Sequence, residues 1–210
     1  MKKVISIKGW KRREHFEFFS QFDEPFWGIT ADVDCTLAYQ KAKKEGHSFF
    51  ISYLHKSIKA VNEIEEFRCR IENGEIVCYD KIHVTTTVSR KNDTFAYSYM
   101  DFNESFETFN QTALAEIERV QNEPGLRLNE NNMRTDVIHY SSIPWLKFTG
   151  LSHARHFKFK DSVPKITFGK CHGTAGKMMM PISVHVNHAL VDGIHMAKFF
   201  EVFQQMLNKQ

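Results

Sequence analysis

Helix-type and strand-type patterns of apolar residues alternate along this chain of 210 residues. Apolar residues at three- and four-residue spacing predict amphipathic helices over residues 51–64 and 106–120. Between them, alternating apolar and polar residues predict a hairpin over 67–79, with Glu72-Asn73-Gly74 as its turn, and a second antiparallel pair over 84–100. Strands and helices in this mixed order indicate an α+β fold.

The last third of the chain combines a strand pattern, a turn and a helix pattern. Residues 181–187 alternate strictly between apolar Ile182, Val184 and Val186 and polar Ser183, His185 and Asn187. This alternation predicts a strand with one buried face, and His188 continues the buried parity at its end. Asp192-Gly193 predicts a turn. A terminal amphipathic helix follows, with an apolar stripe formed by Ile194, Ala197, Phe200, Phe203 and Leu207.

The histidine at this strand–turn–helix junction has three possible roles. An imidazole on an apolar face loses solvation of its charged form, which favours the neutral form that accepts a proton. A hydrogen-bonded core histidine is the commoner case. Metal binding is the third alternative, but in a regular strand His185 and His188 point to opposite faces, so no metal site is predicted. The periodicity alone leaves the role of His188 open.

Composition and charge narrow the class of protein. Hydrophobic residues make up 42% and charged residues 25%, without repeats or linkers, which predicts one globular domain over residues 1–210. A net charge of +3 gives no reason to expect nucleic acid as a partner. No apolar run suits a signal peptide or a membrane span, so a cytoplasmic protein is expected. The four cysteines, at 35, 69, 78 and 171, lack Cys-x-x-Cys spacing, and reduced, mostly buried thiols are expected.

The segment His188-Ala-Leu-Val-Asp192-Gly193 resembles the His-x-x-x-Asp-Gly signature of chloramphenicol acetyltransferases, dihydrolipoamide acyltransferases and related CoA-dependent acyltransferases. Residues 10–19, 141–145 (Ser-Ser-Ile-Pro-Trp) and 164–170 also resemble segments of chloramphenicol acetyltransferases, in the same order and spacing. This resemblance covers nearly the whole chain. It implies a two-layer sandwich, in which a mixed β-sheet packs with helices, and a homotrimer with active sites between subunits.

The resemblance also implies a reaction and roles for individual residues. Acetyl passes directly from acetyl-CoA, a co-substrate, to the primary hydroxyl of chloramphenicol, which confers antibiotic resistance; no tightly bound cofactor is implied. His188 is the general base, Ser141 stabilises the oxyanion, Thr167 holds a site water, and Asp192 pairs with Arg12 to hold the site. The positions near CoA are Trp145, Lys170, Cys171, Ser141 and Thr167. The acceptor positions are Phe18, Phe19, Pro25, Trp27, Thr85, Thr87, Phe95, Leu128, His139, Leu151, His153, Arg155 and Ile166.

Several positions depart from the family pattern. Asn187 replaces the first of two adjacent histidines, while His153 and Arg155 stand where aliphatic residues are usual, and Leu151 replaces a phenylalanine. Asn187 points away from His188, so little catalytic effect is expected from that change. Because an unpaired buried polar group costs about 1 to 3 kcal/mol, the changes at 151, 153 and 155 predict reduced or altered affinity for chloramphenicol. Cys171 replaces an aromatic residue and Ser48 replaces a lysine, and these two changes predict a lower affinity for CoA. Two alternatives stay open: an O-acyltransferase for another hydroxylated small molecule, and a non-catalytic protein that binds drug or CoA.

Overall fold

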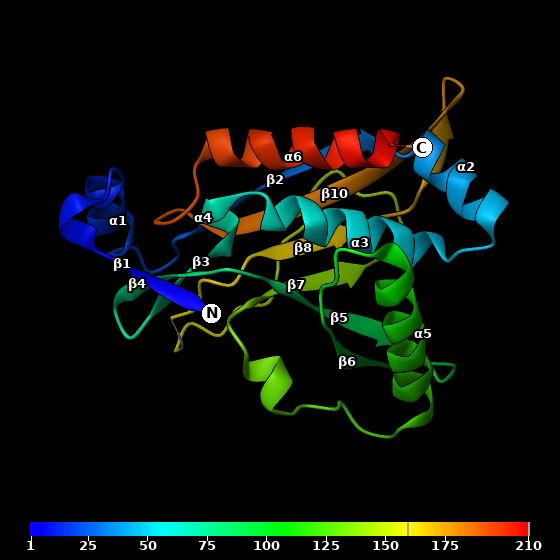
Figure 1. The fold of residues 1–210 in the computed structure, drawn as a ribbon, viewed down its shortest axis with the longest axis horizontal. Coiled ribbons are helices and arrows are strands. Elements are labelled where there is room, and N and C mark those ends of the chain that lie inside the picture. Colours follow the sequence, from blue (N-terminus) through cyan, green and yellow to red (C-terminus); the bar gives the residue numbers. More distant parts are fainter. Residues whose placement is uncertain (159, 210) are drawn as a thin grey trace.

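A mixed seven-stranded sheet forms the centre of the molecule in the computed structural model, which describes residues 1–158 and 160–209 (Figure 1). Its strands run in the order β2 (Phe26–Asp34), β10 (Lys177–Asn187), β8 (Lys165–Phe168), β7 (Val137–Ser142), β5 (His83–Ser89) and β6 (Phe95–Met100). The short strand β9 (His172–Thr174) pairs with β10. The β5–β7 and β7–β8 pairs are parallel and the other pairs are antiparallel, which confirms the mixed sheet.

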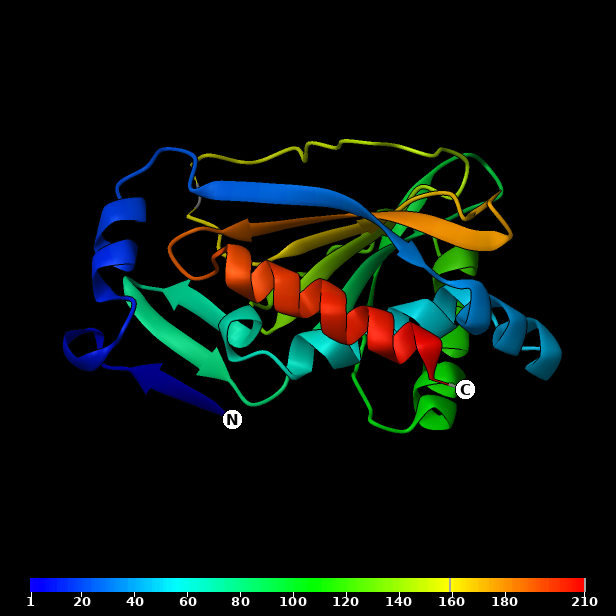
Figure 2. The same cartoon turned by 90° about the horizontal axis from the view of Figure 1, so that it is seen from above.

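Helices cover one face of this sheet (Figure 2). They are α2 (Thr36–Glu45), α3 (Phe49–Asn62), α5 (Phe106–Asn122) and α6 (Gly193–Asn208). The α3 helix begins where the Ser48 hydroxyl accepts the backbone N–H of Ile51, and its apolar stripe, Ile51, Leu54 and Ile58, is fully buried. The helices predicted over 51–64 and 106–120 are therefore confirmed, and the helix layer on the sheet is the predicted two-layer sandwich.

A second, three-stranded sheet lies beside the first and consists of β1 (Lys2–Ile5), β4 (Glu75–Tyr79) and β3 (Cys69–Glu72). Two short helices, α1 (Arg13–Phe19) and α4 (Glu65–Arg68), adjoin this sheet, and two 3₁₀ turns, η1 (Ile7–Gly9) and η2 (Glu130–Met133), complete the elements. The hairpin between β3 and β4 turns where the sequence predicted, but Glu72 pairs with Glu75, so the turn consists of two residues instead of the predicted three. Asn73 and Gly74 both have positive φ, 51° and 82°, as the tight type I′ turn requires.

The expectation that every cysteine is a reduced thiol is wrong for one pair. Cys69 and Cys78 lie directly opposite each other on β3 and β4, with their Cα atoms 4.0 Å apart, and a disulfide joins them. The physical reason is the hairpin register, which places opposite side chains in contact across two strands. Inspection of Cys-x-x-Cys spacing alone does not detect such a cross-strand pair.

The C-terminal helix also differs from its prediction. Asp192 is the N-cap of α6, and the chain turns earlier, at residues 188–190. The predicted stripe is therefore only partly correct: Phe203 and Leu207 are buried, but Ile194 is 72% exposed. The remaining buried positions of the helix are Met196, Phe199 and Met206. The strand pattern before the turn is confirmed, since Ile182, Val184 and Val186 are all fully buried.

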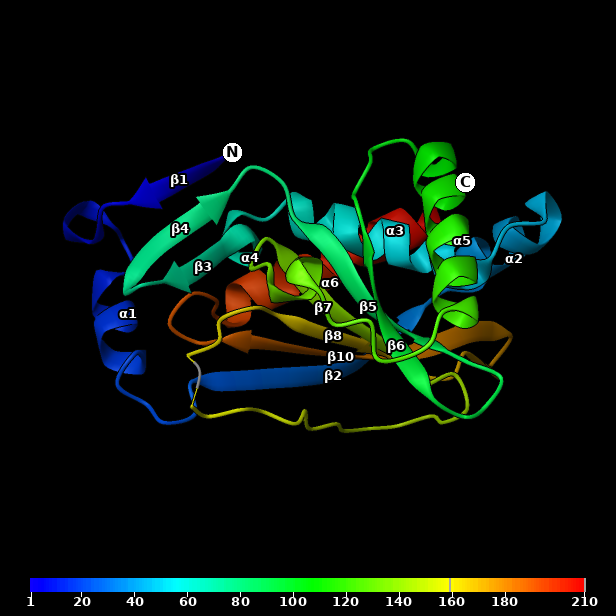
Figure 3. The same ribbon diagram turned by 90° about the horizontal axis from the view of Figure 1, so that it is seen from below.

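The sheet face opposite the helices is covered by the long connection between β7 and β8 (Figure 3). This cover makes Ser183 and Asn187 buried, so the prediction that β10 has only one buried face is wrong. The ring of His153, in the connection, packs edge-on against His185 with centroids 4.9 Å apart. On the neighbouring strand Gly28 leaves room for the His185 ring, because a Cβ there would lie 2.7 Å from it. Among the described residues, no helix is long and apolar enough to span a bilayer.

Candidate active site

The imidazole of His188 is fixed by stacking and by its own main chain. Phe19 stacks on the ring, with centroids 3.9 Å apart and planes 6° apart, and Trp27 lies on it at 5.0 Å. The backbone N–H of His188 donates to the carbonyl of Pro25 at 2.8 Å. The side chain is 31% exposed, and its buried Nδ1 lies 3.4 Å from a carboxylate oxygen of Asp192 without forming a hydrogen bond to any described residue. The ring is thus held in one orientation while part of it remains open to a reactant.

The turn after β10 is held by an ion pair between two distant segments. The guanidinium of Arg12, the residue before α1, donates to both carboxylate oxygens of Asp192 and, at 3.3 Å, to the carbonyl of His188. The Arg12 side chain is 6% exposed and that of Asp192 25%. Burial opposes ionisation of Asp192, but the hydrogen bond and charge of Arg12 outweigh it and lower the pKa of the carboxyl. The expected pairing is present, and it clamps the backbone that carries His188.

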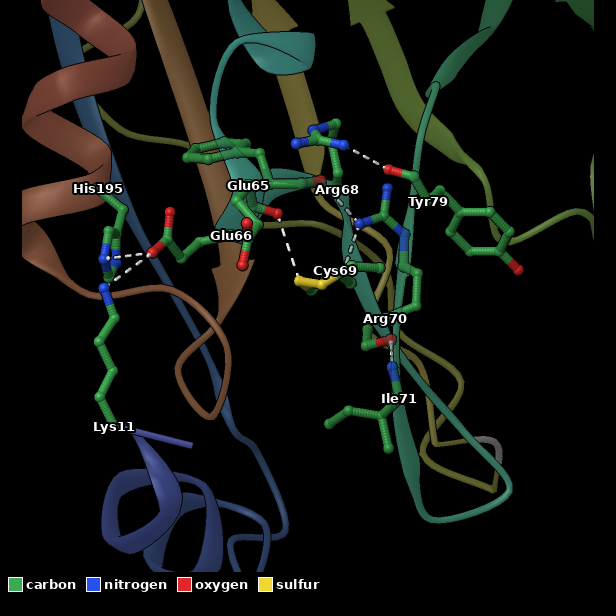
Figure 4. The surroundings of a disulfide bond; sticks show 12 residues. Lys11, Glu65, Glu66, Arg68, Cys69, Arg70, Ile71, Tyr79 and His195 are labelled. Atoms are coloured by element: carbon green, nitrogen blue, oxygen red, sulfur yellow. Dashed lines mark hydrogen bonds and ion pairs between the residues drawn. A yellow bond between two sulfur atoms is a disulfide. The ribbon is translucent and has the colours of Figure 1, made fainter. Parts of the chain in front are cut away.

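A second network, which the sequence did not indicate, continues from Asp192. The backbone N–H of Asp192 donates to Nδ1 of His195 at 2.9 Å, so the imidazole caps the first turn of α6. Because Nδ1 accepts, the other ring nitrogen carries the proton, and it lies 3.2 Å from a Glu66 carboxylate oxygen. Lys11 lies 3.9 Å from the same oxygen. Figure 4 shows these three side chains meeting beside the Cys69–Cys78 disulfide, so helix α4, through Glu66, supports the start of α6.

This network predicts an acid-sensitive contribution to stability. The hydrogen bond from His195 lowers the pKa of Glu66 to about 2. A carboxyl with a depressed folded-state pKa stabilises the protein above its unfolded value, about 4.3, and loses that contribution as the pH falls towards the folded value. Glu66→Gln should therefore lose less stability than the wild type between pH 5 and pH 2.5, as measured by urea unfolding. Equal losses in the two proteins would contradict this assignment.

Ser141 and Thr167 lie side by side, but far from His188 in the same chain. They pair in register between β7 and β8, and Thr167 also pairs with Ser183 of β10. Thr167 is 1% exposed, and its hydroxyl has no hydrogen-bond partner among the described residues. Since Ser183 precedes His188 by five residues, the imidazole lies about 16 Å along the sheet from this pair, at roughly 3.3 Å per residue. One chain therefore contains the two halves of the expected catalytic set in separate places.

The expected acceptor positions divide between the same two places. Phe19, Pro25 and Trp27 contact His188, and Phe18 packs on Phe19 at 5.1 Å while remaining 58% exposed. Strand pairing places Thr85 beside His139 on the face that carries Ser141. Thr87 lies on the same strand face as Thr85. Phe95, the first residue of β6, is 46% exposed, and Leu128, in the segment after α5, is 66% exposed.

Ile166 was expected to contact the acceptor, but its side chain points to the opposite face of the sheet from Ser141. Its side chain is fully buried in the core under the helices, beside Val184, because it alternates with Lys165 and Thr167 on β8. Lys165 occupies the opposite face instead, with its ammonium 2.5 Å from the Asp161 carboxylate. The expectation for Ile166 is therefore corrected, and Lys165 with Asp161 joins the face that carries Ser141.

Ionisable side chains are concentrated on this face. Burial, and then the charge of Lys165, lowers the pKa of His139 to about 4; burial, and then His185, lowers that of His153 to about 4. Both imidazoles are neutral at pH 7, and Nε2 of His153 is buried without a hydrogen-bond partner among the described residues. Arg155 pairs with Glu24 at 2.7 Å and lies 3.5 Å from the centre of the Phe26 ring. Leu151, in the same connection, is half-buried.

Three of the positions expected near CoA, Trp145, Lys170 and Cys171, lie close together beyond the C-terminal end of β8. The backbone N–H of Lys170 donates to the carbonyl of Leu146 at 2.9 Å, which brings Lys170 close to Trp145, 70% exposed. Cys171 follows and is partly exposed. Ser48, in contrast, uses its hydroxyl to cap α3. No group of three or more metal-ligating side chains with metal-site geometry occurs in the described parts of the chain.

Comparison with known proteins identifies the family of the chain. A family model described as chloramphenicol acetyltransferase matches residues 2–204. A chloramphenicol acetyltransferase from Campylobacter coli is 28% identical over 207 residues, 98% of each chain, and one from Clostridium perfringens is 27% identical over 205 residues, 97% of this chain and 93% of the relative. A solved structure of a chloramphenicol acetyltransferase is 32% identical, superposes with a TM-score of 0.93, and covers 99% of this chain and 100% of the other. The chain therefore belongs to the chloramphenicol acetyltransferase family of acyltransferase enzymes.

Proposed function

We propose that this enzyme transfers acetyl from acetyl-CoA to the primary hydroxyl of chloramphenicol, with His188 as general base. The proposal is supported by family membership and by an imidazole that is held rigidly yet partly open. In the reaction, the unprotonated ring nitrogen that faces the acceptor takes the hydroxyl proton as the oxygen attacks the thioester carbonyl. Collapse of the tetrahedral intermediate breaks the carbon–sulfur bond, and the CoA thiolate takes the proton back from His188. A substrate of this kind is consistent with a cytoplasmic enzyme, since acetyl-CoA is made and used inside cells.

We further propose that each active site is completed by a second copy of the chain in a homotrimer. The observation that carries this proposal is the strand register, which places Thr167 beside Ser183, five residues before His188. At the usual rise of a strand, about 16 Å of backbone separates them, too far for both side chains to act on one reacting carbon. The surface near His188 is also apolar, with Phe18 and Phe22 58% and 45% exposed. Strand β2 pairs only with β10 and leaves its other edge open. These features suit a subunit interface.

Hybrid assembly tests the shared site directly. His188→Ala and Ser141→Ala, each with little activity alone, are unfolded together, refolded and assayed. If each site takes His188 from one subunit and Ser141 from the next, random trimers regain about a quarter of the wild-type sites, because each mixed trimer has one intact site in three. Sites made within one chain would give no recovery, and that result would overturn the proposed interface.

The hydroxyl of Ser141 is the proposed donor to the oxyanion of the intermediate. A donor aimed at developing negative charge lowers the barrier by about 2.7 to 4 kcal/mol, so Ser141→Ala should lower kcat by roughly 10²- to 10³-fold with little change in KM for either substrate. Steady-state measurement of CoA thiol release gives both constants. Ser142→Ala, which removes the hydroxyl bonded to Tyr53 at 3.1 Å on the other side of the strand, is the matched control. Equal losses in both variants would contradict the role of Ser141.

A different hydroxylated acceptor is the second candidate, and the ionisable face favours it. The unpartnered His153 nitrogen offers a hydrogen bond that an acceptor without a matching polar group leaves unmet, at a cost of about 1 to 3 kcal/mol. A panel of alcohols, including polar and charged ones, assayed for thiol release beside chloramphenicol separates the candidates by kcat/KM. Turnover of another alcohol at a higher kcat/KM supports the second candidate. Binding of chloramphenicol without any turnover would support a non-catalytic binding protein.

A further inference from the structure

Two free cysteines that are far apart in the sequence meet at the end of the sheet. The sulfur atoms of Cys35 and Cys171 lie 3.1 Å apart. Cys35 is the N-cap of α2 and is fully buried, whereas Cys171 lies between β8 and β9 and is partly exposed. A disulfide has its sulfurs about 2.05 Å apart, so an approach of about 1 Å would join them.

The main chain around Cys35 holds this arrangement. The backbone N–H of Cys35 donates to the carbonyl of Met178 on β10 at 2.8 Å, and its thiol lies 3.2 Å from the same oxygen. The next residue, Thr36, accepts the N–H of Met178 at 2.9 Å through its hydroxyl. Cys35 is therefore fastened to the sheet, and Cys171, on a connecting segment, is the residue that can move.

We propose that Cys35 and Cys171 form a dithiol site that reacts with small-molecule disulfides. The exposed Cys171 thiolate attacks a disulfide RS–SR, which forms a mixed disulfide and releases one RS⁻. The Cys35 sulfur then attacks the Cys171 sulfur, which forms the Cys35–Cys171 bond and releases the second RS⁻. The two thiol protons leave with the two released thiolates, so the dithiol is oxidised and one small disulfide is reduced to two thiols.

The environment of the two thiols supports this order of attack. The hydrogen bond between the two sulfur atoms lowers the pKa of Cys171. The same hydrogen bond, followed by burial, raises the pKa of Cys35. The exposed sulfur is therefore the more readily ionised of the two, and the thiolate is the form that reacts.

The consequence for catalysis rests on the proposed function. Cys171 directly follows Lys170, and both residues are expected near CoA. Oxidation would pull the segment 170–172 towards α2 and away from its reduced position. We therefore expect the KM for acetyl-CoA to rise by about threefold or more, about 0.7 kcal/mol, with kcat little changed, and a thiol reductant to reverse the change.

The experiment treats the reduced enzyme with oxidised glutathione and maps the cysteine peptides by mass spectrometry after blocking free thiols. Peptide mapping separates the new bond from the Cys69–Cys78 disulfide and does not depend on activity. The wild type should yield a Cys35–Cys171 peptide. Cys35→Ser should retain glutathione on Cys171, and Cys171→Ser should leave Cys35 unmodified.

Two results would overturn the proposed site: no modification of either cysteine in the wild type, or stable glutathione on Cys171 while Cys35 is intact. Kinetics on the same samples address the catalytic consequence alone. An enzyme that forms the bond but does not acetylate chloramphenicol would contradict the proposed function and leave the dithiol site standing. An unchanged KM for acetyl-CoA after complete oxidation would overturn the link to catalysis.

Discussion

Replacing His188 by alanine is expected to lower kcat/KM for acetyl transfer by roughly 10² to 10⁴, the usual contribution of a positioned general base. The imidazole is held between Phe19 and Trp27, and its main chain is fixed by Pro25 and Arg12. These contacts position the ring to take the proton of the acceptor hydroxyl. Without the ring, the hydroxyl must attack the thioester with its proton still attached. The fall in thioester absorbance measures the loss without adding a disulfide that could oxidise Cys35 and Cys171.

The control for this variant is a histidine remote from the reaction. His47 follows α2, at the opposite end of the molecule from α1 (Figure 1), and its ring contacts Phe106. His47→Gln should retain the wild-type kcat/KM. The thermal midpoint of His188→Ala should stay close to that of the wild type, because the ring is one-third exposed. A His188→Ala enzyme with nearly full activity would refute the role as base.

Local patterns of apolar and polar residues were sufficient to predict most of the helices and strands. The 3.6-residue repeat of α3 and α5 and the two-residue repeat of β10 each depend on one buried face, which any packed helix or strand must have. The start of α6 was predicted to within one residue, at 194 instead of 193. Asp before Gly occurs both in turns and at N-caps, and the contacts of Asp192 with Arg12 and His195 favour the cap here. The burial of Ser183 was missed because the covering segment is distant in sequence and has no repeat of its own.

The site depends on contacts that no local pattern encodes. Arg12 and Asp192 are 180 positions apart, and only the resemblance to the family paired them. No sequence pattern singles out Glu66 as a site residue, since it is one of three acidic residues before the hairpin. His195 does carry a signal, because it lies three residues after the N-cap, the position of a capping residue. The error at Ile166 is a shift of one residue along β8, and in a strand such a shift exchanges the two faces. Strand register is thus the step at which alignment by motif fails most readily.

Removing the charge of Asp192 is expected to destabilise the fold as well as the site. Asp192→Ala leaves the guanidinium of Arg12, 6% exposed, without its carboxylate. Breaking a buried pair in this way costs about 3 to 5 kcal/mol, and the lower end applies here because Asp192 is one-quarter exposed. Urea unfolding at a fixed protein concentration measures the change, since assembly contributes to the stability of an oligomer. Activity should fall too, because Arg12 also binds the carbonyl of His188.

The double variant Arg12→Met, Asp192→Leu separates the cost of an unpaired charge from the value of the pair. If the loss in Asp192→Ala comes chiefly from the stranded guanidinium, an apolar pair of similar volume should unfold at a higher urea concentration than Asp192→Ala. The turn at 188–190 would still lack the bond from Arg12 to the carbonyl of His188, so kcat/KM should stay low in the stable double variant. Recovery of both stability and activity would mean that packing alone, without the ion pair, orients His188.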